Sequence, residues 1–161
     1  MKRIVFLLAL LALLGAAFAQ DFGPSVTVLA PNPVTLTPGK AASVTVHCRV
    51  NDGFHINSNK PNSEILIPTE LQLEPPAQVT VSSISYPPGE MLSLPVINEK
   101  ISVYSGDFQI VAHLLGARNA APGTYRVNGQ LKFQACNDRQ CFPPRTTPVH
   151  FEVKITGASK K

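Results

Sequence analysis

The sequence predicts an all-β protein, an antiparallel sandwich of short strands in a single domain. Three observations support this fold class. All 15 prolines lie beyond position 19, about twice the usual frequency, and proline is poorly tolerated inside helices. Short segments alternate between apolar and polar residues, as strands with one buried face do. No segment beyond the first 19 residues keeps a 3.6-residue apolar period long enough for a helix.

The first 19 residues have the layout of a leader rather than of a domain. Lys2 and Arg3 precede an almost unbroken apolar run, Ile4 to Ala17, and Ala17-Phe18-Ala19 has the small-x-small pattern of a cleavage site. The apolar run is shorter than the roughly 20 residues that a membrane-spanning helix needs. We therefore expect a signal peptide at residues 1–19 and an exported, soluble mature domain at residues 20–161.

The charge of the mature part points to no polyanionic partner. Without Lys2 and Arg3, 12 of the 14 basic residues remain against 10 acidic ones, a net charge of +2. The only basic cluster is Lys160-Lys161 at the end of the chain. The sequence therefore favours neither a nucleic-acid interface nor insertion of the mature chain into a membrane.

The predicted strands follow one another with turn residues between them. The clearest is Ala42 to Val50, in which every second residue is apolar. Turns are indicated by Pro31-Asn32-Pro33, Asp52-Gly53, Gly116 and Ala121-Pro122-Gly123. The expected strands are Ser25–Leu29, Ala42–Val50, Phe54–Asn57, Glu70–Leu73, Val79–Tyr86, Ile101–Tyr104, Phe108–Leu115, Thr124–Ala135 and Val149–Ile155. Eight or nine short strands in a chain of this length are typical of an immunoglobulin-like sandwich.

One segment interrupts this pattern. Residues Pro87 to Lys100 contain three prolines and show little strand character. Loops of about this length in compact domains are usually functional or mobile. We therefore expect a long functional loop here.

The strand phase suggests how the three cysteines pair. Cys48 lies on the apolar face of its strand, so we expect a buried free thiol. The polar phase of Thr124–Ala135 continues to Cys136, which should therefore leave its strand on the polar side. A bond between Cys48 and Cys136 would need both sulfurs inward. We therefore expect a Cys136–Cys141 disulfide, kept wet by the polar residues between its cysteines.

This disulfide could serve as a staple or as an exchange site. Closing so short a loop stabilises a fold by about 2 kcal/mol in the chain-entropy model, whereas a Cys48–Cys136 bond would contribute about 4 kcal/mol or more. Short exposed disulfides are more often the reducible ones. Arg139 would favour a thiolate and Asp138 would oppose it. These residues alone leave both roles open.

Metal binding and cofactor chemistry have little support in the sequence. His47 and Cys48 are adjacent on a strand and so point to opposite faces, which separates two of the four candidate ligands. The other two, Cys136 and Cys141, do not form a paired zinc-ligand spacing with them. We expect no metal site and no cofactor.

The cysteine segment also resembles a known family. QACNDRQCFPP (Gln134–Pro144) is similar to the cysteine hairpin of the N-terminal periplasmic domain of the thiol:disulfide interchange protein DsbD. The likeness extends over roughly Val44 to Val153. The other similar segments are NDGFHINSNKP (Asn51–Pro61), LIPTELQLE (Leu66–Glu74), YPPGEM (Tyr86–Met91) and VYSGDFQIVAHL (Val103–Leu114).

The resemblance implies a redox function for an immunoglobulin-like fold. The cysteine pair of such domains cycles between dithiol and disulfide, taking electrons from a thioredoxin-like domain and passing them to thioredoxin-like partners in the periplasm. By position, Cys141 would form the mixed disulfide and Cys136 would resolve it. Leu92–Lys100 would be a cap over the sulfurs, in which Leu94, Pro95, Val96 and Ile97 stand where well-studied members carry aromatic residues.

The chain also departs from the family pattern. His55 and Asn57 correspond by position to tyrosines near the disulfide, and we place both, with Arg139, as neighbours of the site. For His55 we favour a half-exposed strand histidine. No transmembrane or thioredoxin segment follows Lys161, so we expect the electron donor to be a separate protein and any protein-disulfide reductase to involve further components. The alternative function is a non-catalytic immunoglobulin-like module for binding or assembly, with a structural disulfide.

Overall fold

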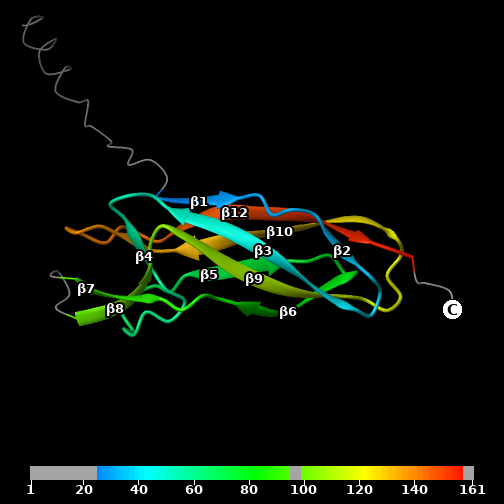
Figure 1. Ribbon diagram of the computed structural model, residues 1–161, viewed down its shortest axis with the longest axis horizontal. Coiled ribbons are helices and arrows are strands. Elements are labelled where there is room, and N and C mark those ends of the chain that lie inside the picture. The colour runs from blue at the N-terminus through cyan, green and yellow to red at the C-terminus, as the bar shows by residue number, and fades with distance from the viewer. Residues whose placement is uncertain (1–24, 95–98, 158–161) are drawn as a thin grey trace, which may run out of the picture.

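The computed structural model describes residues 25–94 and 99–157, and in these ranges it is built of strands and connecting segments without a helix (Figure 1). The predicted signal peptide and residues 95–98 lie outside the described residues. The strands are β1 (Val26–Leu29), β2 (Val34–Leu36), β3 (Ala41–Val50), β4 (His55–Asn57), β5 (Glu70–Glu74), β6 (Val79–Ser85), β7 (Glu90–Leu94), β8 (Glu99–Tyr104), β9 (Asp107–Gly116), β10 (Gly123–Phe133), β11 (Ala135–Cys136) and β12 (Arg145–Ile155). The all-β prediction is confirmed.

The strands form three sheets of four strands each. The first sheet has the order β1-β3-β9-β6 and the second the order β2-β12-β10-β5. The third sheet, in the order β11-β4-β8-β7, carries the strand that contains Cys136. Figure 1 shows β4, β7 and β8 gathered toward one end of the long axis, with β2 toward the other. All neighbouring strands are antiparallel except β2 and β12, which are parallel.

The core lies between the first two sheets, as the alternation in β3 predicts. In that strand Val44, Val46, Cys48 and Val50 are buried, and β9 and β10 alternate in the same way. Side chains of both sheets meet in two clusters. The cluster nearer the third sheet consists of Val26, Val46, Cys48, Val50, Ile56, Leu71, Tyr104, Phe108, Ile110, Leu131, Phe133, Ala135 and Val149. This cluster includes residues of β4, β10 and β11, so it supports the strands that lead into and border the cysteine segment.

The long loop expected at Pro87–Lys100 is instead largely a β-hairpin. β7 and β8 pair antiparallel from Glu90↔Val103 to Leu94↔Glu99. The sequence concealed β7 because two prolines precede it and its residues do not alternate strictly. The register also shows that β8 joins this hairpin to β4, since Ile56 pairs with Tyr104.

The hairpin is packed closely at its base. A Cβ added to Gly89 would lie 2.1 Å from the Ser102 Oγ and 2.9 Å from the Ser58 Cβ. The Tyr104 hydroxyl donates to Asn59 Oδ1 at 2.7 Å and to the Pro87 carbonyl at 3.1 Å. These contacts hold the segment that leads into β7 against β8 and the residues that follow β4. Among the described residues, no helix is long and apolar enough to cross a membrane.

Candidate functional site

Cys136 and Cys141 form a disulfide, with an Sγ–Sγ distance of 2.04 Å and a Cα–Cα distance of 3.9 Å. Cys48 is a buried free thiol. Both parts of the predicted cysteine pairing are confirmed.

The backbone between the two cysteines closes a compact turn. The Asn137 N–H donates to the Gln140 carbonyl at 2.9 Å, and the Phe142 N–H donates to the Ala135 carbonyl at 2.8 Å. The Asn137 side chain accepts hydrogen bonds from the N–H groups of Arg139 and Gln140, both at 2.9 Å. A side-chain oxygen that accepts from the backbone in this way stabilises a turn. The turn therefore holds Cys136 and Cys141 side by side.

The two sulfur-bearing residues have opposite environments. Cys136 is 0% exposed, whereas Cys141 is exposed. The prediction that Cys136 leaves its strand on the polar side is wrong, and the expectation that the pair stays wet holds for Cys141 but not for Cys136. The reason is that β10 ends at Phe133 and the chain then passes from the second sheet to the third, where Ala135 and Cys136 are both buried. Of the two residues, Cys141 is therefore the one exposed to solvent.

Gln134 holds the chain at this crossover. Its Oε1 accepts from Asn57 Nδ2 at 3.0 Å and from the Ile67 N–H at 3.2 Å. Its Nε2 donates to the Phe142 carbonyl at 3.3 Å. One side chain thus joins β4, the segment before β5 and the residue after Cys141. Nothing in the spacing of residues around Gln134 had pointed to this role.

Asn57, a predicted neighbour of the site, is part of the same network. It is 0% exposed, and its Nδ2 also donates to the Ile67 carbonyl at 2.9 Å. Its backbone carbonyl accepts from the Thr69 hydroxyl. These contacts show Asn57 holding the strand next to β11. They place it beneath the site rather than on its surface.

His55, the second predicted neighbour, lies directly across the sheet from Cys136. The two residues are Cα partners in the antiparallel pair β4–β11. His55 is 6% exposed, so the expectation of a half-exposed histidine is wrong. Burial lowers the pKa of its imidazole, and the charge of Asp138 partly opposes this by raising it. Sequence phase could not reveal this pairing because it depends on which strand borders β4.

Arg139 lies at the exposed tip of the turn, where its backbone contacts Asn137. Behind Cys141, Phe142 packs against the core cluster. Its ring centroid is 5.8 Å from that of Phe54, with the ring planes tilted by 54°. The segment that carries Cys141 is therefore anchored by an aromatic contact. This contact was not predicted from the sequence.

The predicted cap falls on the hairpin β7–β8. Leu94 is the last residue of β7, whereas Pro95, Val96 and Ile97 lie outside the described residues. The hairpin belongs to the same sheet as the disulfide strand, with β4 between β11 and β8. One strand, β4, therefore lies between the hairpin of the predicted cap and the strand that contains Cys136.

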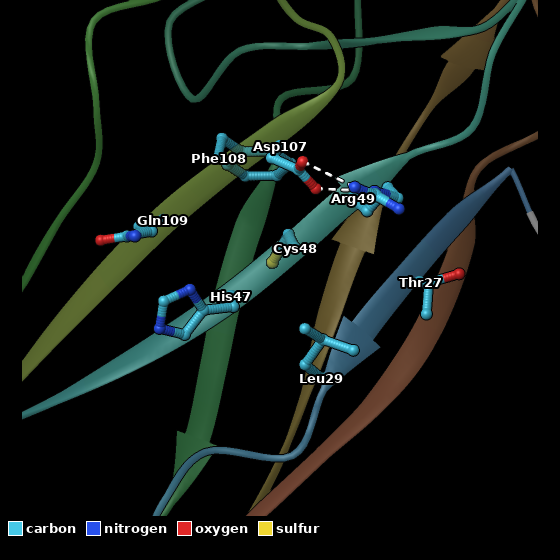
Figure 2. A pocket seen from close by; sticks show the side chains of 8 residues that line it. All are labelled: Thr27, Leu29, His47, Cys48, Arg49, Asp107, Phe108 and Gln109. Carbon is cyan, nitrogen blue, oxygen red and sulfur yellow. Dashed lines mark hydrogen bonds and ion pairs between the residues drawn. The ribbon is translucent and has the colours of Figure 1, made fainter.

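A separate hollow of about 640 Å³ lies on the outer face of the first sheet (Figure 2). Arg49 and Asp107 pair across it, with Nε–Oδ1 and Nη2–Oδ2 distances of 2.7 and 2.8 Å. Cys48 borders the hollow, but it is 2% exposed and burial raises its pKa to about 12. This thiol is therefore unreactive at neutral pH. The other residues that line the hollow are Thr27, Leu29, His47, Phe108 and Gln109.

Comparison with known proteins identifies relatives of the chain. The family model described as "Thiol:disulfide interchange protein DsbD, N-terminal" matches residues 25–152. No curated protein matches the chain at a significant level. The structure is similar to the N-terminal periplasmic domain of ScsB from Proteus mirabilis, with a TM-score of 0.54 and 13% identity over 83% of this chain. The chain spans about half (49%) of that ScsB chain.

A second similar structure is the complex between the DsbD N-terminal and the PilB N-terminal domains from Neisseria meningitidis. Its TM-score is 0.44 and its identity 20%, and the alignment covers 83% of this chain and 88% of that one.

Proposed function

Because the chain belongs to the family of the N-terminal domain of the thiol:disulfide interchange protein DsbD, we propose that it exchanges electrons with thioredoxin-like proteins through Cys136 and Cys141. Domains of this family are periplasmic and serve in thiol:disulfide interchange. The charged start and apolar run of residues 1–19 support export of this chain to the same compartment.

The observation that carries the proposal is the asymmetry of the disulfide. Exchange requires one sulfur that an incoming thiolate can reach and a second that can expel the partner. Cys141 is exposed, and Cys136 is bonded to it and fully buried. The arrangement therefore supports Cys141 as the cysteine that forms the mixed disulfide and Cys136 as the one that resolves it.

The reaction transfers two electrons. A thiolate of the reduced partner attacks Cys141 Sγ, the Cys136–Cys141 bond breaks, and Cys136 leaves as a thiolate. The second thiol of the partner, as its thiolate, then attacks the partner sulfur of the mixed disulfide, and Cys141 leaves. The domain becomes a dithiol and the partner a disulfide. The reverse sequence passes the electrons to an oxidised partner.

Variants in which one cysteine is replaced by alanine test this assignment. The probe is a thioredoxin with one active-site cysteine replaced by serine and the other loaded as a mixed disulfide with 2-nitro-5-thiobenzoate. Cys136→Ala leaves the exposed Cys141, which should displace the chromophore and form a covalent adduct. Cys141→Ala leaves the buried Cys136 and should react far more slowly. The measurement is chromophore release together with a gel shift under non-reducing conditions.

Cys48→Ala is the matched control for loss of a cysteine, and it should form the native disulfide as the unaltered protein does. A Cys136→Ala protein that is folded but forms no adduct would contradict the proposal. The remaining interpretation would then be a binding or assembly module whose disulfide is structural.

A further inference from the structure

We propose that His55 accepts the proton of the Cys136 thiol when Cys136 resolves the mixed disulfide, and donates a proton to Cys136 when Cys136 is the leaving group. This inference rests on the proposed function and adds a proton acceptor to it. It assigns a chemical role to a side chain in the third sheet that the exchange scheme above does not use.

His55 lies directly opposite Cys136 in the third sheet. Directly opposed residues of an antiparallel pair project their side chains from the same face of the sheet, with Cβ atoms about 4.5–5.5 Å apart. His55 and Cys136 are such a pair. Both are buried, at 6% and 0% exposure. The register therefore places His55 next to Cys136 on one face of the sheet.

Cys136 needs a proton acceptor when it acts as the resolving cysteine. A thiol attacks a disulfide as its thiolate, and burial in apolar surroundings disfavours the charged form. Cys48 shows the size of this effect in the same fold, since burial raises its pKa to about 12. A resolving cysteine that is equally buried would react slowly at neutral pH without a neighbouring proton acceptor. An imidazole kept neutral by burial can act as one.

One ring nitrogen of His55 has no hydrogen-bond partner within the described part of the chain in the disulfide state. His55 Nε2 is buried and has no hydrogen-bond partner among the described residues. Buried polar atoms without partners are uncommon in folded proteins. In the disulfide state neither sulfur carries a proton. Reduction gives Cys136 an S–H group, which can donate to Nε2. The atom that lacks a partner in one redox state thus gains one in the other.

The surrounding groups favour this role. The strands next to β4 are β11 and β8. From the turn after β11, the charge of Asp138 raises the pKa of His55 and would stabilise the imidazolium after proton transfer. From β8, the Tyr104 hydroxyl is engaged with Asn59 and the Pro87 carbonyl and does not compete for the proton. His55 is therefore the titratable group paired with Cys136.

The resolving step balances as follows. The Cys136 S–H proton passes to His55 Nε2, and the thiolate attacks Cys141 Sγ. The bond between Cys141 and the partner sulfur breaks, and the partner leaves as a thiolate. His55 then releases its proton to water or to that thiolate. When a reduced partner opens the disulfide, His55 first takes a proton from the attacking partner thiol or from water, and then donates it to the leaving Cys136 thiolate.

The test uses the reduced full-length mature protein and Ellman's reagent (5,5′-dithiobis(2-nitrobenzoate)) as the probe. The first chromophore released reports attack by Cys141, and the second reports resolution by Cys136. In the unaltered protein, the rate of the second phase should level off above the pKa of His55. In His55→Gln, this phase should slow on the order of a hundredfold near neutral pH. Its rate should then rise with pH until it approaches that of the unaltered protein.

His150→Gln is the matched control, because His150 lies exposed on β12. It should leave both phases unchanged, and His55→Gln should leave the first phase unchanged. A second phase of normal rate and pH profile in folded His55→Gln would overturn the inference. Absence of the first phase in the unaltered protein would overturn the proposed function itself.

A measurement on the unaltered protein avoids any effect of substitution on folding. The ring resonances of His55 are titrated by NMR in the disulfide and dithiol states. A hydrogen bond from the Cys136 S–H favours the neutral imidazole, so the pKa of His55 should be lower in the dithiol state. Identical titration curves in the two states would refute the inference.

Discussion

The three cysteines have the same side chain but three different environments. Cys141 is exposed and Cys136 is fully buried beside His55. Cys48 is buried in the core, and desolvation raises its pKa to about 12. Thiol reactivity follows accessibility and the fraction present as thiolate. The order of reactivity should therefore be Cys141, then Cys136, then Cys48.

This order can be measured by alkylation. The protein is reduced, freed of reductant and treated with iodoacetamide near neutral pH, and each cysteine is followed by mass spectrometry. We expect Cys141 to be modified first and Cys48 last. In guanidinium chloride, which removes the differences in burial, the three rates should converge. A folded protein in which Cys48 reacts as fast as Cys141 would contradict the burial argument.

At the level of elements, the decisive feature is the passage of the chain from β10 to β11. β10 pairs with β5 and β12 in the second sheet, whereas β11 pairs with β4 in the third. Gln134, the residue between β10 and β11, accepts two hydrogen bonds and donates one, to three different segments. These bonds add to the backbone bond in which the Gln134 carbonyl accepts from the Asn57 N–H at 3.2 Å.

Gln134→Ala should therefore cost more than the loss of a surface glutamine. Removing the side chain leaves the Ile67 N–H and the Asn57 amide without a shared acceptor. The expected loss in the free energy of unfolding is about 1–3 kcal/mol. Gln130→Ala on the same strand is the matched control. Gln130 is exposed and its side chain donates to Gln72 at the surface of the sheet, so its loss should stay within about 0.5 kcal/mol.

Urea unfolding of the two variants gives the comparison. Equal unfolding free energies would show that the crossover does not depend on Gln134. A larger loss in Gln134→Ala, with a more easily reduced disulfide, would show that it does.

At the scale of the whole molecule, the core rather than the disulfide holds the fold. The two main clusters lie between the first and second sheets and include one cysteine, the free Cys48. The disulfide joins residues separated by 5 positions, so it restricts the unfolded chain only slightly. The domain can therefore keep its fold while the bond opens and closes, as an exchange domain must.

Unfolding of the oxidised and the reduced protein checks this. The reduced form should unfold cooperatively in urea, with a free energy of unfolding lower by about 2 kcal/mol. The variant with Cys136→Ala and Cys141→Ala should show no dependence on reductant. If the reduced protein has no cooperative transition, the disulfide is a structural staple and the redox proposal fails.

Strand alternation is a local property, and it predicted most of the fold. Val44, Val46 and Val50 are buried together as their spacing indicates, and the expected strands from Ser25 to Ile155 nearly all appear. The missed strands are short or irregular. β2 has three residues and β11 has two, which is too few for a period to be read, and β7 follows two prolines.

The sequence by itself determined the all-β class, the core face of each long strand, the pairing of Cys136 with Cys141 and the buried free thiol at Cys48. The fold class, the core faces and the burial of Cys48 follow from residue type and spacing within one segment. The cysteine pairing was predicted correctly, although one of its premises, the exit of Cys136 on the polar side, is wrong. Only the tertiary structure decided that Cys136 is buried while Cys141 is exposed, that His55 lies opposite Cys136, and that Gln134 joins three segments. These features depend on which strands become neighbours, and that choice is made by packing between residues far apart in the chain.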